Sequence, residues 1–109
     1  MVFFHNREVW WCALGANLGD EQDGKGKSFI CPIIVLRKFT KTIFWALPLT
    51  TKRKTGTYYY RLSSIGGKEA TVTLNQLRLI DARRLSHKIG DVSKEEFREL
   101  KQKLKALLP

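Results

Sequence analysis

The sequence predicts a compact, mainly β domain: an antiparallel barrel or half-barrel with a small α part, a single helix at the C-terminal end. Two observations favour this fold class. Short apolar segments rich in β-branched and aromatic residues alternate with turn signals over most of the chain, and helical periodicity is confined to its last part. A chain of 109 residues buries one modest core and not two, so we expect one domain over residues 1–109.

Two apolar runs form the expected centre of the barrel, and a short basic link joins them. The runs are Phe29–Leu36 and Ile43–Leu49, with Arg37–Thr42 between them. Both are too short for typical helices and have the composition of buried strands. Because the connection is tight, we expect the two strands to be antiparallel neighbours. Pro32 lacks an N–H group, which indicates an edge position or a bulge at the start of the first strand.

Three further segments have strand composition, and polar connections separate them. The strands are expected over Glu8–Leu14, Tyr58–Leu62 and Ala70–Leu74; loops cover Gly15–Lys27 and Thr50–Thr57, and a turn with the Gly66–Gly67 pair at its tip covers Ser63–Glu69. The first loop lacks the GxxxxGK[ST] spacing of a P-loop. The adjacent Trp10 and Trp11 are more typical of core and rim packing than of a platform that stacks nucleic-acid bases.

The C-terminal third is expected to complete the barrel and then form the helix. Asn75–Arg84 mixes a strand end with a short turn or helical segment, and Asp81 is expected to cap that turn. Alternation sets Arg78 on the opposite face from its two leucine neighbours, which for such an arginine is usually the exposed face. Ser93 and Glu96 form a capping box at the start of the helix. The apolar stripe of the helix consists of Phe97, Leu100, Leu104, Leu107 and Leu108.

The net charge indicates a polyanionic partner. The chain carries 20 Lys and Arg against 10 Asp and Glu, a formal charge of +10. Such an excess favours nucleic acid, bound through phosphate neutralisation and counterion release; a solvated basic surface with no specific partner is the alternative. No stretch has the apolar length of a membrane span, and the N-terminus lacks signal-peptide architecture. We therefore expect a cytoplasmic protein without a membrane partner.

The cysteines and histidines do not form a metal-site pattern. Cys12 and Cys31 lack zinc-ligand spacing, and His5 and His87 add no cluster to them. We therefore expect neither a metal nor a cofactor. Free buried thiols are expected rather than a disulfide, because a cytosolic protein keeps its cysteines reduced.

Several segments, in order along the chain, carry a resemblance to a known family. They are VWWCALG, GDEQDGK, CPIIVL, ALPLTT and NQLRLIDARRLSHKIG, and together they are similar to the MazF/PemK family of type II toxin–antitoxin endoribonucleases. The GKGKSF and YYYRL segments resemble a PemK-like subgroup. The resemblance implies an SH3-like barrel of the MazF/PemK/CcdB type that forms a homodimer. It also implies a sequence-specific, metal-independent toxin that cleaves single-stranded RNA such as mRNA, and a small acidic antitoxin as its partner.

The resemblance also implies two catalytic positions. In the family, a Thr in a PLTT-like element and an Arg immediately before the strand-opening Pro carry catalysis; here these positions are Thr50 and Cys31. Cleavage by the RNA's own 2′-OH leaves a 2′,3′-cyclic phosphate and a 5′-OH, and a cation stabilises the charged phosphorane. A thiol that is mostly neutral supplies no such cation.

Three explanations for Cys31 stay open, and all of them concern the missing guanidinium. Cys31 is an inactivating substitution, or another cation replaces the arginine, or the thiol itself acts. The candidate replacement cations are Lys27, Arg37, Lys52 and Arg53. We expect an RNA-binding member of a ribonuclease family whose cleavage activity is weakened or absent.

RNA-binding residues are expected in the loops, because the family's RNA groove lies between two subunits and is lined by them. The candidates are Gln22, Lys25, Lys27, Lys52, Arg53, Lys54, Gln76 and Arg78. The lysines would contact phosphates, while Gln22, Gln76 and Arg78 would read base edges. Two alternatives come from other functional classes: a toxin similar to CcdB, which binds DNA gyrase without hydrolysis, and a non-catalytic regulator that binds nucleic acid.

Overall fold

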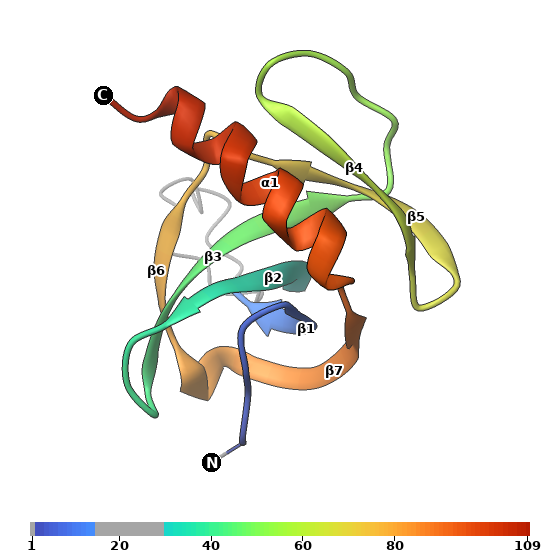
Figure 1. Ribbon diagram of the computed structural model, residues 1–109. Coiled ribbons are helices and arrows are strands. Elements are labelled where there is room, and N and C mark those ends of the chain that lie inside the picture. Colours follow the sequence, from blue (N-terminus) through green and yellow to red (C-terminus); the bar gives the residue numbers. More distant parts are fainter. Residues whose placement is uncertain (1, 15–29) are drawn as a thin grey trace, which may run out of the picture.

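The computed structural model describes residues 2–14 and 30–109, and within them the chain forms an antiparallel sheet followed by one α-helix (Figure 1). The strands are β1 (Glu8–Ala13), β2 (Ile30–Lys38), β3 (Ile43–Thr50), β4 (Tyr59–Ile65), β5 (Lys68–Thr73), β6 (Arg78–Asp81) and β7 (Leu85–Asp91). A short 3₁₀ helix, η2 (Ala82–Arg84), separates β6 from β7, and α1 spans Lys94–Leu107. The expected loop Gly15–Lys27 and the start of the strand expected from Phe29 lie outside the described residues.

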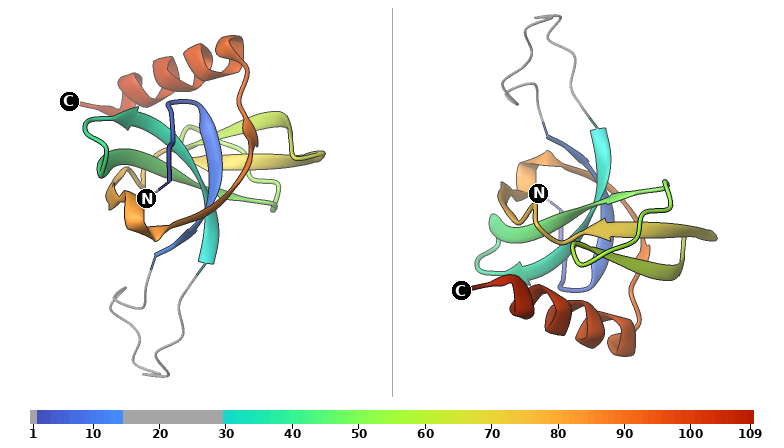
Figure 2. Two further views of the ribbon diagram at one scale, coloured as in Figure 1. Left: turned by 90° about the horizontal axis from the view of Figure 1, so that it is seen from below. Right: turned by 90° about the horizontal axis from the view of Figure 1, so that it is seen from above.

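The strand order is β4-β5-β3-β2-β1-β7, and β6 pairs with β3 beside this path. All of these pairs are antiparallel. The two ends of β3 have different partners, because Ile43–Ala46 pair with β6 while Leu49 and Thr50 pair with β5. The sheet therefore curls into a half-barrel, with the β4–β5 hairpin projecting from it and α1 lying across one side (Figure 2). The expected fold class is confirmed.

Both faces of the central strands are buried. Ile34 of β2 and Leu47 of β3 belong to a core cluster that also includes Leu100 of α1. Their neighbours on the opposite face, among them Ile33 and Phe44, form a second cluster with other residues of the barrel. This two-sided burial explains why β2 and β3 are almost continuously apolar in sequence, and their expected antiparallel pairing is confirmed.

Pro32 is at a local edge position near the start of β2, although β2 is an inner strand of the sheet, and it is not at a bulge. β2 lies between β1 and β3, and the register irregularity of the β2–β3 pair falls later, between Val35 and Arg37. Pro32 opposes Trp11 of β1, whereas the β3 ladder begins only one residue later, with Ile33 opposite Pro48. The proline is tolerated because β2 is paired on one side only at this point.

The helix begins as predicted, but its capping box is only half formed. Ser93 is the N-cap, and its hydroxyl accepts the N–H of Glu96 at 3.1 Å. The Glu96 carboxylate does not return to Ser93; it accepts the N–H of Ser63 in β4 at 3.0 Å. Phe97, Leu100 and Leu104 of the predicted apolar stripe are buried, whereas Leu108 is the C-cap residue and is 52% exposed, so the barrel does not cover this end of the stripe.

Two strand predictions need correction. The segment Ser63–Glu69 is mostly strand, because β4 runs on to Ile65 and β5 begins at Lys68. A register irregularity between Leu62 and Ile65 interrupts the alternation of apolar and polar residues, so the sequence pattern did not indicate a strand here. Strand β7 (Leu85–Asp91) was not predicted, because it is largely exposed and lacks an apolar face; among the described strands it pairs with β1 alone. In contrast, Asp81 caps η2 as predicted, with its carboxylate accepting the N–H of Arg83 at 2.8 Å.

No helix in the described part of the chain is both long and apolar enough to cross a membrane. In the same residues, no group of three or more His, Cys, Asp and Glu side chains is arranged to hold a metal ion.

Candidate nucleic-acid interface

Thr50 is the last residue of β3 and opposes Thr71 of β5. Its side chain is half-buried, and its hydroxyl oxygen accepts the backbone N–H of Lys52 at 3.2 Å. Because the hydroxyl is an acceptor in this contact, its own proton remains available for donation to another group. The strand end thus presents a hydroxyl donor at the border of solvent.

Cys31 lies in β2 directly opposite Cys12 of β1, and both are free thiols. Cys12 is fully buried, and the half-buried Cys31 packs against the same cluster. Burial raises the pKa of both thiols, to about 11 for Cys12. The thiol of Cys31 is therefore neutral near pH 7, which disfavours the hypothesis that it acts as a catalytic nucleophile or anion.

The strand register relates Cys31 to Thr50. Ile33 of β2 opposes Pro48 of β3, and Cys31 and Thr50 each lie two residues further toward the same end of the sheet. Since side chains alternate along a strand, both are on the face that carries Ile33 and its partners. The strands separate there, because the end of β3 pairs with β5. The two predicted catalytic positions therefore share an end and a face of the half-barrel.

Arg78 faces inward toward this same side of the sheet. It opposes Ala46 of β3, and its half-buried side chain alternates with Leu79, which is 63% exposed. Arg78 and Leu79 lie on opposite faces, as predicted. However, the arginine is on the inner face and the leucine on the exposed face, which is the reverse of the usual arrangement. The positive charge of Arg78 lowers the pKa of Cys31, against the larger effect of burial. The guanidinium of Arg78 thus acts electrostatically on the thiol at this predicted catalytic position.

The basic loop after β3 is exposed and partly anchored to the β4–β5 hairpin. The guanidinium of Arg53 donates to Glu69 at 3.1 Å, and Arg61 pairs with the same carboxylate. The ammonium of Lys54 lies 5.7 Å from the ring centroid of Tyr59. Lys52 is exposed and sits two residues beyond Thr50. This loop places three cations next to the end of β3.

The other predicted site residues are not all brought together. Gln76 is exposed between β5 and β6. Arg37 is six residues from Cys31 along β2, about 20 Å away at the rise of a strand, so it cannot replace an arginine at position 31. Gln22, Lys25 and Lys27 lie outside the described residues.

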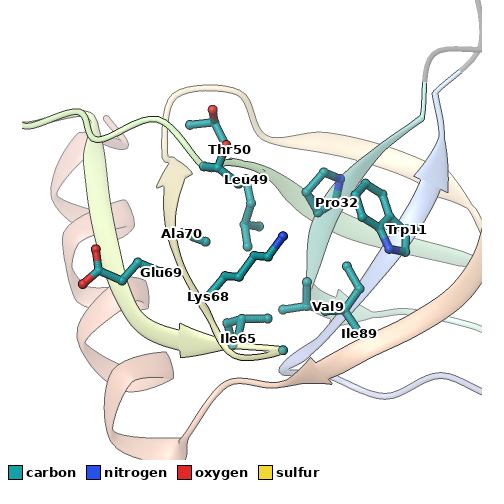
Figure 3. Close-up of a pocket in the computed structure, with 12 residues that line it drawn as sticks. Val9, Trp11, Pro32, Leu49, Thr50, Ile65, Lys68, Glu69, Ala70 and Ile89 are labelled. Carbon is teal, nitrogen blue, oxygen red and sulfur yellow. The ribbon is translucent and has the colours of Figure 1, made fainter.

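A cavity of about 230 Å³ opens beside Thr50, between the β1–β2 pair and the β4–β5 hairpin (Figure 3). Trp11, Pro32 and Leu49 form part of its wall, and Lys68 and Thr50 are on its border. The sequence analysis did not select Trp11 or Lys68 as site residues. The only sequence signal for Trp11 was its position next to Trp10. Neighbouring side chains of a strand lie on opposite faces, so only one of the two tryptophans lies on a given face of the sheet.

The comparisons with known proteins show which family the chain belongs to. Residues 5–108 match the model of the PemK-like, MazF-like toxins of type II toxin–antitoxin systems, so the chain is a member of this family of endoribonuclease toxins. No curated protein gives a significant sequence match.

Solved structures agree with the fold. MazF from Deinococcus radiodurans has a TM-score of 0.77 at 19% identity, covering 98% of this chain and 97% of its own. An endoribonuclease from Mycobacterial species has a TM-score of 0.74 at 15% identity, with 100% and 98% covered. A MazE–MazF structure from Deinococcus radiodurans matches at 0.76 and 18% identity, with 97% and 96% covered. These similarities are too low in identity to show more than the shared architecture.

Proposed function

We propose that this chain is a cytoplasmic, sequence-specific and metal-independent endoribonuclease toxin that cleaves single-stranded RNA. We also propose that its cleavage is weakened or absent, because Cys31 stands at the position of the catalytic arginine. The observation that carries the proposal is the common location of Thr50 and Cys31 at one end and on one face of the half-barrel. Family membership supports the reaction class.

The chemistry requires the protein to orient the RNA and to stabilise negative charge. The 2′-OH attacks the adjacent phosphorus, the bond to the 5′ oxygen breaks, and the products are a 2′,3′-cyclic phosphate and a 5′-OH. The hydroxyl of Thr50 is available to donate to a phosphate oxygen. A guanidinium would match two phosphate oxygens and stay protonated, whereas the neutral thiol of Cys31 does neither.

Arg78 is the described cation best placed to act in place of the missing arginine. It faces inward on the side of the sheet that holds Cys31, and its charge acts on that thiol. Lys52 and Arg53 stay candidates for phosphate contacts in the adjacent loop, with Lys54 beside them. Gln76 is proposed to contact bases from the turn before β6. Gln22, Lys25 and Lys27 keep their predicted RNA-binding role.

The test is cleavage of a long single-stranded RNA in the absence of divalent metal. The unaltered protein is compared with Cys31→Arg and with the double variant Cys31→Arg plus Thr50→Ala. Since loss of one transition-state contact costs roughly a hundredfold or more, Cys31→Arg should cleave at least that much faster. The double variant should lose this gain. Equal rates for the unaltered protein and Cys31→Arg would overturn the assignment of position 31.

Residual cleavage by the unaltered protein allows Arg78 to be tested directly. Arg78→Gln should abolish it, whereas Arg37→Gln, the matched control at the far end of β2, should leave it unchanged. RNA binding without cleavage by any variant would favour the non-catalytic regulator. Gyrase-dependent DNA breaks would favour the function similar to CcdB.

Two protein partners complete the proposal: a second copy of this chain and a cognate acidic antitoxin. The Deinococcus MazF relative has been crystallised with MazE, and a mycobacterial endoribonuclease with its cognate antitoxin. The formal charge of +10 suits an acidic partner. A patch of exposed Phe39, Trp45 and Leu79 is proposed to bind the second copy. Trp45 opposes Leu79 across β3 and β6, and the rings of Phe39 and Trp45 lie 4.9 Å apart.

A further inference from the structure

We propose that the cavity beside Thr50 is a subsite for one base of the RNA, with Trp11 as its stacking wall and Lys68 as its cationic contact. This inference rests on the proposed function, because it takes single-stranded RNA as the ligand. It adds a position that binds a base next to the cleaved bond.

The size and lining of the cavity suit one flat ring system. Its volume of about 230 Å³ is below the roughly 300–1,000 Å³ of pockets that hold drug-sized ligands. The floor is apolar and includes Val9, Ile65 and Ile89, and the indole of Trp11 stands beside Pro32 on one side (Figure 3). A base brings a flat, weakly hydrated face that matches this apolar floor, whereas the side chains of the floor offer no hydrogen-bond donor to a phosphate.

The two adjacent tryptophans have different roles. The indole N–H of Trp10 donates to Glu8 at 2.9 Å, and Trp10 is only 7% exposed, so both its ring and its donor are used inside the protein. Trp11 is half-buried, and among the described residues its indole N–H has no hydrogen-bond partner. The ring centroids of Trp11 and His87 lie 6.4 Å apart, with the planes tilted by 44°. Trp11 therefore keeps a donor and ring surface for a ligand.

Lys68 supplies positive charge over the apolar floor. Its side chain extends across the cavity with the ammonium directed toward Pro32 and Trp11 (Figure 3). The neighbouring Glu69 points away from the cavity and pairs with Arg53 and Arg61. Within the part of the chain that the structure describes, Lys68 takes part in no ion pair. The ammonium is thus available to the face of a base or to the phosphate that follows it.

The location of the cavity ties it to the reaction. Thr50 is on the border of the cavity, and the basic residues Lys52 and Arg53 follow it in the chain. A base held against Trp11 would lie at the same end of the sheet as Thr50, and the RNA would continue around the end of β3 to reach the face that carries the Thr50 side chain. Anchoring a base adjacent to the reacting phosphate restricts the RNA to fewer orientations, which is the main requirement for attack by its 2′-OH.

The experiment measures binding of a mixed-sequence single-stranded RNA by fluorescence anisotropy and by quenching of tryptophan emission. Trp11→Ala should weaken binding roughly tenfold or more, because a stacked base is lost, and Trp11→Phe should largely preserve affinity. Lys68→Gln should also weaken binding and reduce its dependence on salt. Phe3→Ala is the matched control: Phe3 is an aromatic residue that is 84% exposed and does not line the cavity, so its loss should change nothing.

Quenching identifies which tryptophan contacts the RNA. Saturable quenching should persist in Trp45→Phe and disappear in Trp11→Phe, although the latter still binds. This readout does not depend on whether Trp11→Ala folds. Tight RNA binding with unchanged affinity in Trp11→Ala, or with quenching retained in Trp11→Phe, would overturn the base subsite and leave the proposed function intact. Failure of the unaltered protein to bind RNA would overturn both.

Discussion

The carboxylate of Glu8 accepts the indole N–H of Trp10 at 2.9 Å, inside a barrel where few charged groups are buried. The same oxygen accepts the backbone N–H of His5 at 2.9 Å, and the second oxygen pairs with Lys88 at 3.2 Å. Burial by itself raises the pKa of Glu8, but the contacts with Trp10, His5 and Lys88 together lower it below its usual value. The folded state therefore prefers this carboxylate ionised.

Because the pKa of Glu8 is lower in the folded than in the unfolded protein, its contribution to stability is complete above about pH 4.5. It is lost as pH falls through the folded pKa. We expect Glu8→Gln to lower the free energy of unfolding by about 1–3 kcal/mol at pH 7. This loss relative to the unaltered protein should become smaller in acid. Urea unfolding at several pH values measures it. Asp91→Asn, which also removes a partner of Lys88 but at an exposed position, should have a smaller effect. A loss of unfolding free energy in Glu8→Gln that becomes larger in acid would contradict the expected pH dependence.

The turn between β4 and β5 supplies a second prediction, because its two glycines differ in surroundings. Gly66 and Gly67 have φ of 61° and 83°, both in the left-handed region. A Cβ on Gly66 would lie 2.8 Å from a methyl carbon of Ile89, whereas a Cβ on Gly67 would meet nothing within 4 Å. Gly67→Ala should therefore cost about 1–2 kcal/mol from backbone strain alone, and Gly66→Ala clearly more.

Thermal or urea unfolding of the two glycine variants checks this difference, with each serving as the control for the other. Since Gly66 also borders the cavity beside Thr50, Gly66→Ala should weaken RNA binding as well. Equal destabilisation by the two substitutions would show that Ile89 moves aside freely.

The exposed patch of Phe39, Trp45 and Leu79 supplies the third prediction. Leu79 is 63% exposed on β6, a strand that pairs only with β3 among the described strands. An apolar residue on such an edge is typical of an association surface. Leu79→Glu should shift the protein from dimer to monomer at concentrations where the unaltered protein is dimeric, as measured by light scattering. Ser64→Glu adds the same charge at an exposed site on β4 and should leave the dimer intact.

Dimer formation by Leu79→Glu with unchanged affinity would place the association surface elsewhere on the molecule. In that case the patch would remain available to another partner, and titration with the proposed antitoxin would be the next measurement.

Local sequence patterns were sufficient for most of the secondary structure. The apolar runs of β2 and β3, the Ser93 N-cap and the Asp81 cap depend on neighbours within a few residues, and the structure has all of them. The prediction was wrong where local and tertiary signals conflict. Strand β7 is stabilised by its pairing with β1 and has little apolar patterning of its own, and the irregularity in β4 interrupts the alternation near Ser63.

By itself, the sequence determined the class of fold and the family, and the resemblance to that family predicted Thr50 and Cys31 as the catalytic positions. Only the tertiary structure decided that Arg78 turns inward toward Cys31, that Trp11 rather than Trp10 borders a cavity, and that Glu96 binds β4 instead of its own N-cap. The physical reason is that propensities, caps and motifs act over a few residues. The face on which a side chain lies, in contrast, depends on strand register and sheet twist, which are set by contacts between distant parts of the chain.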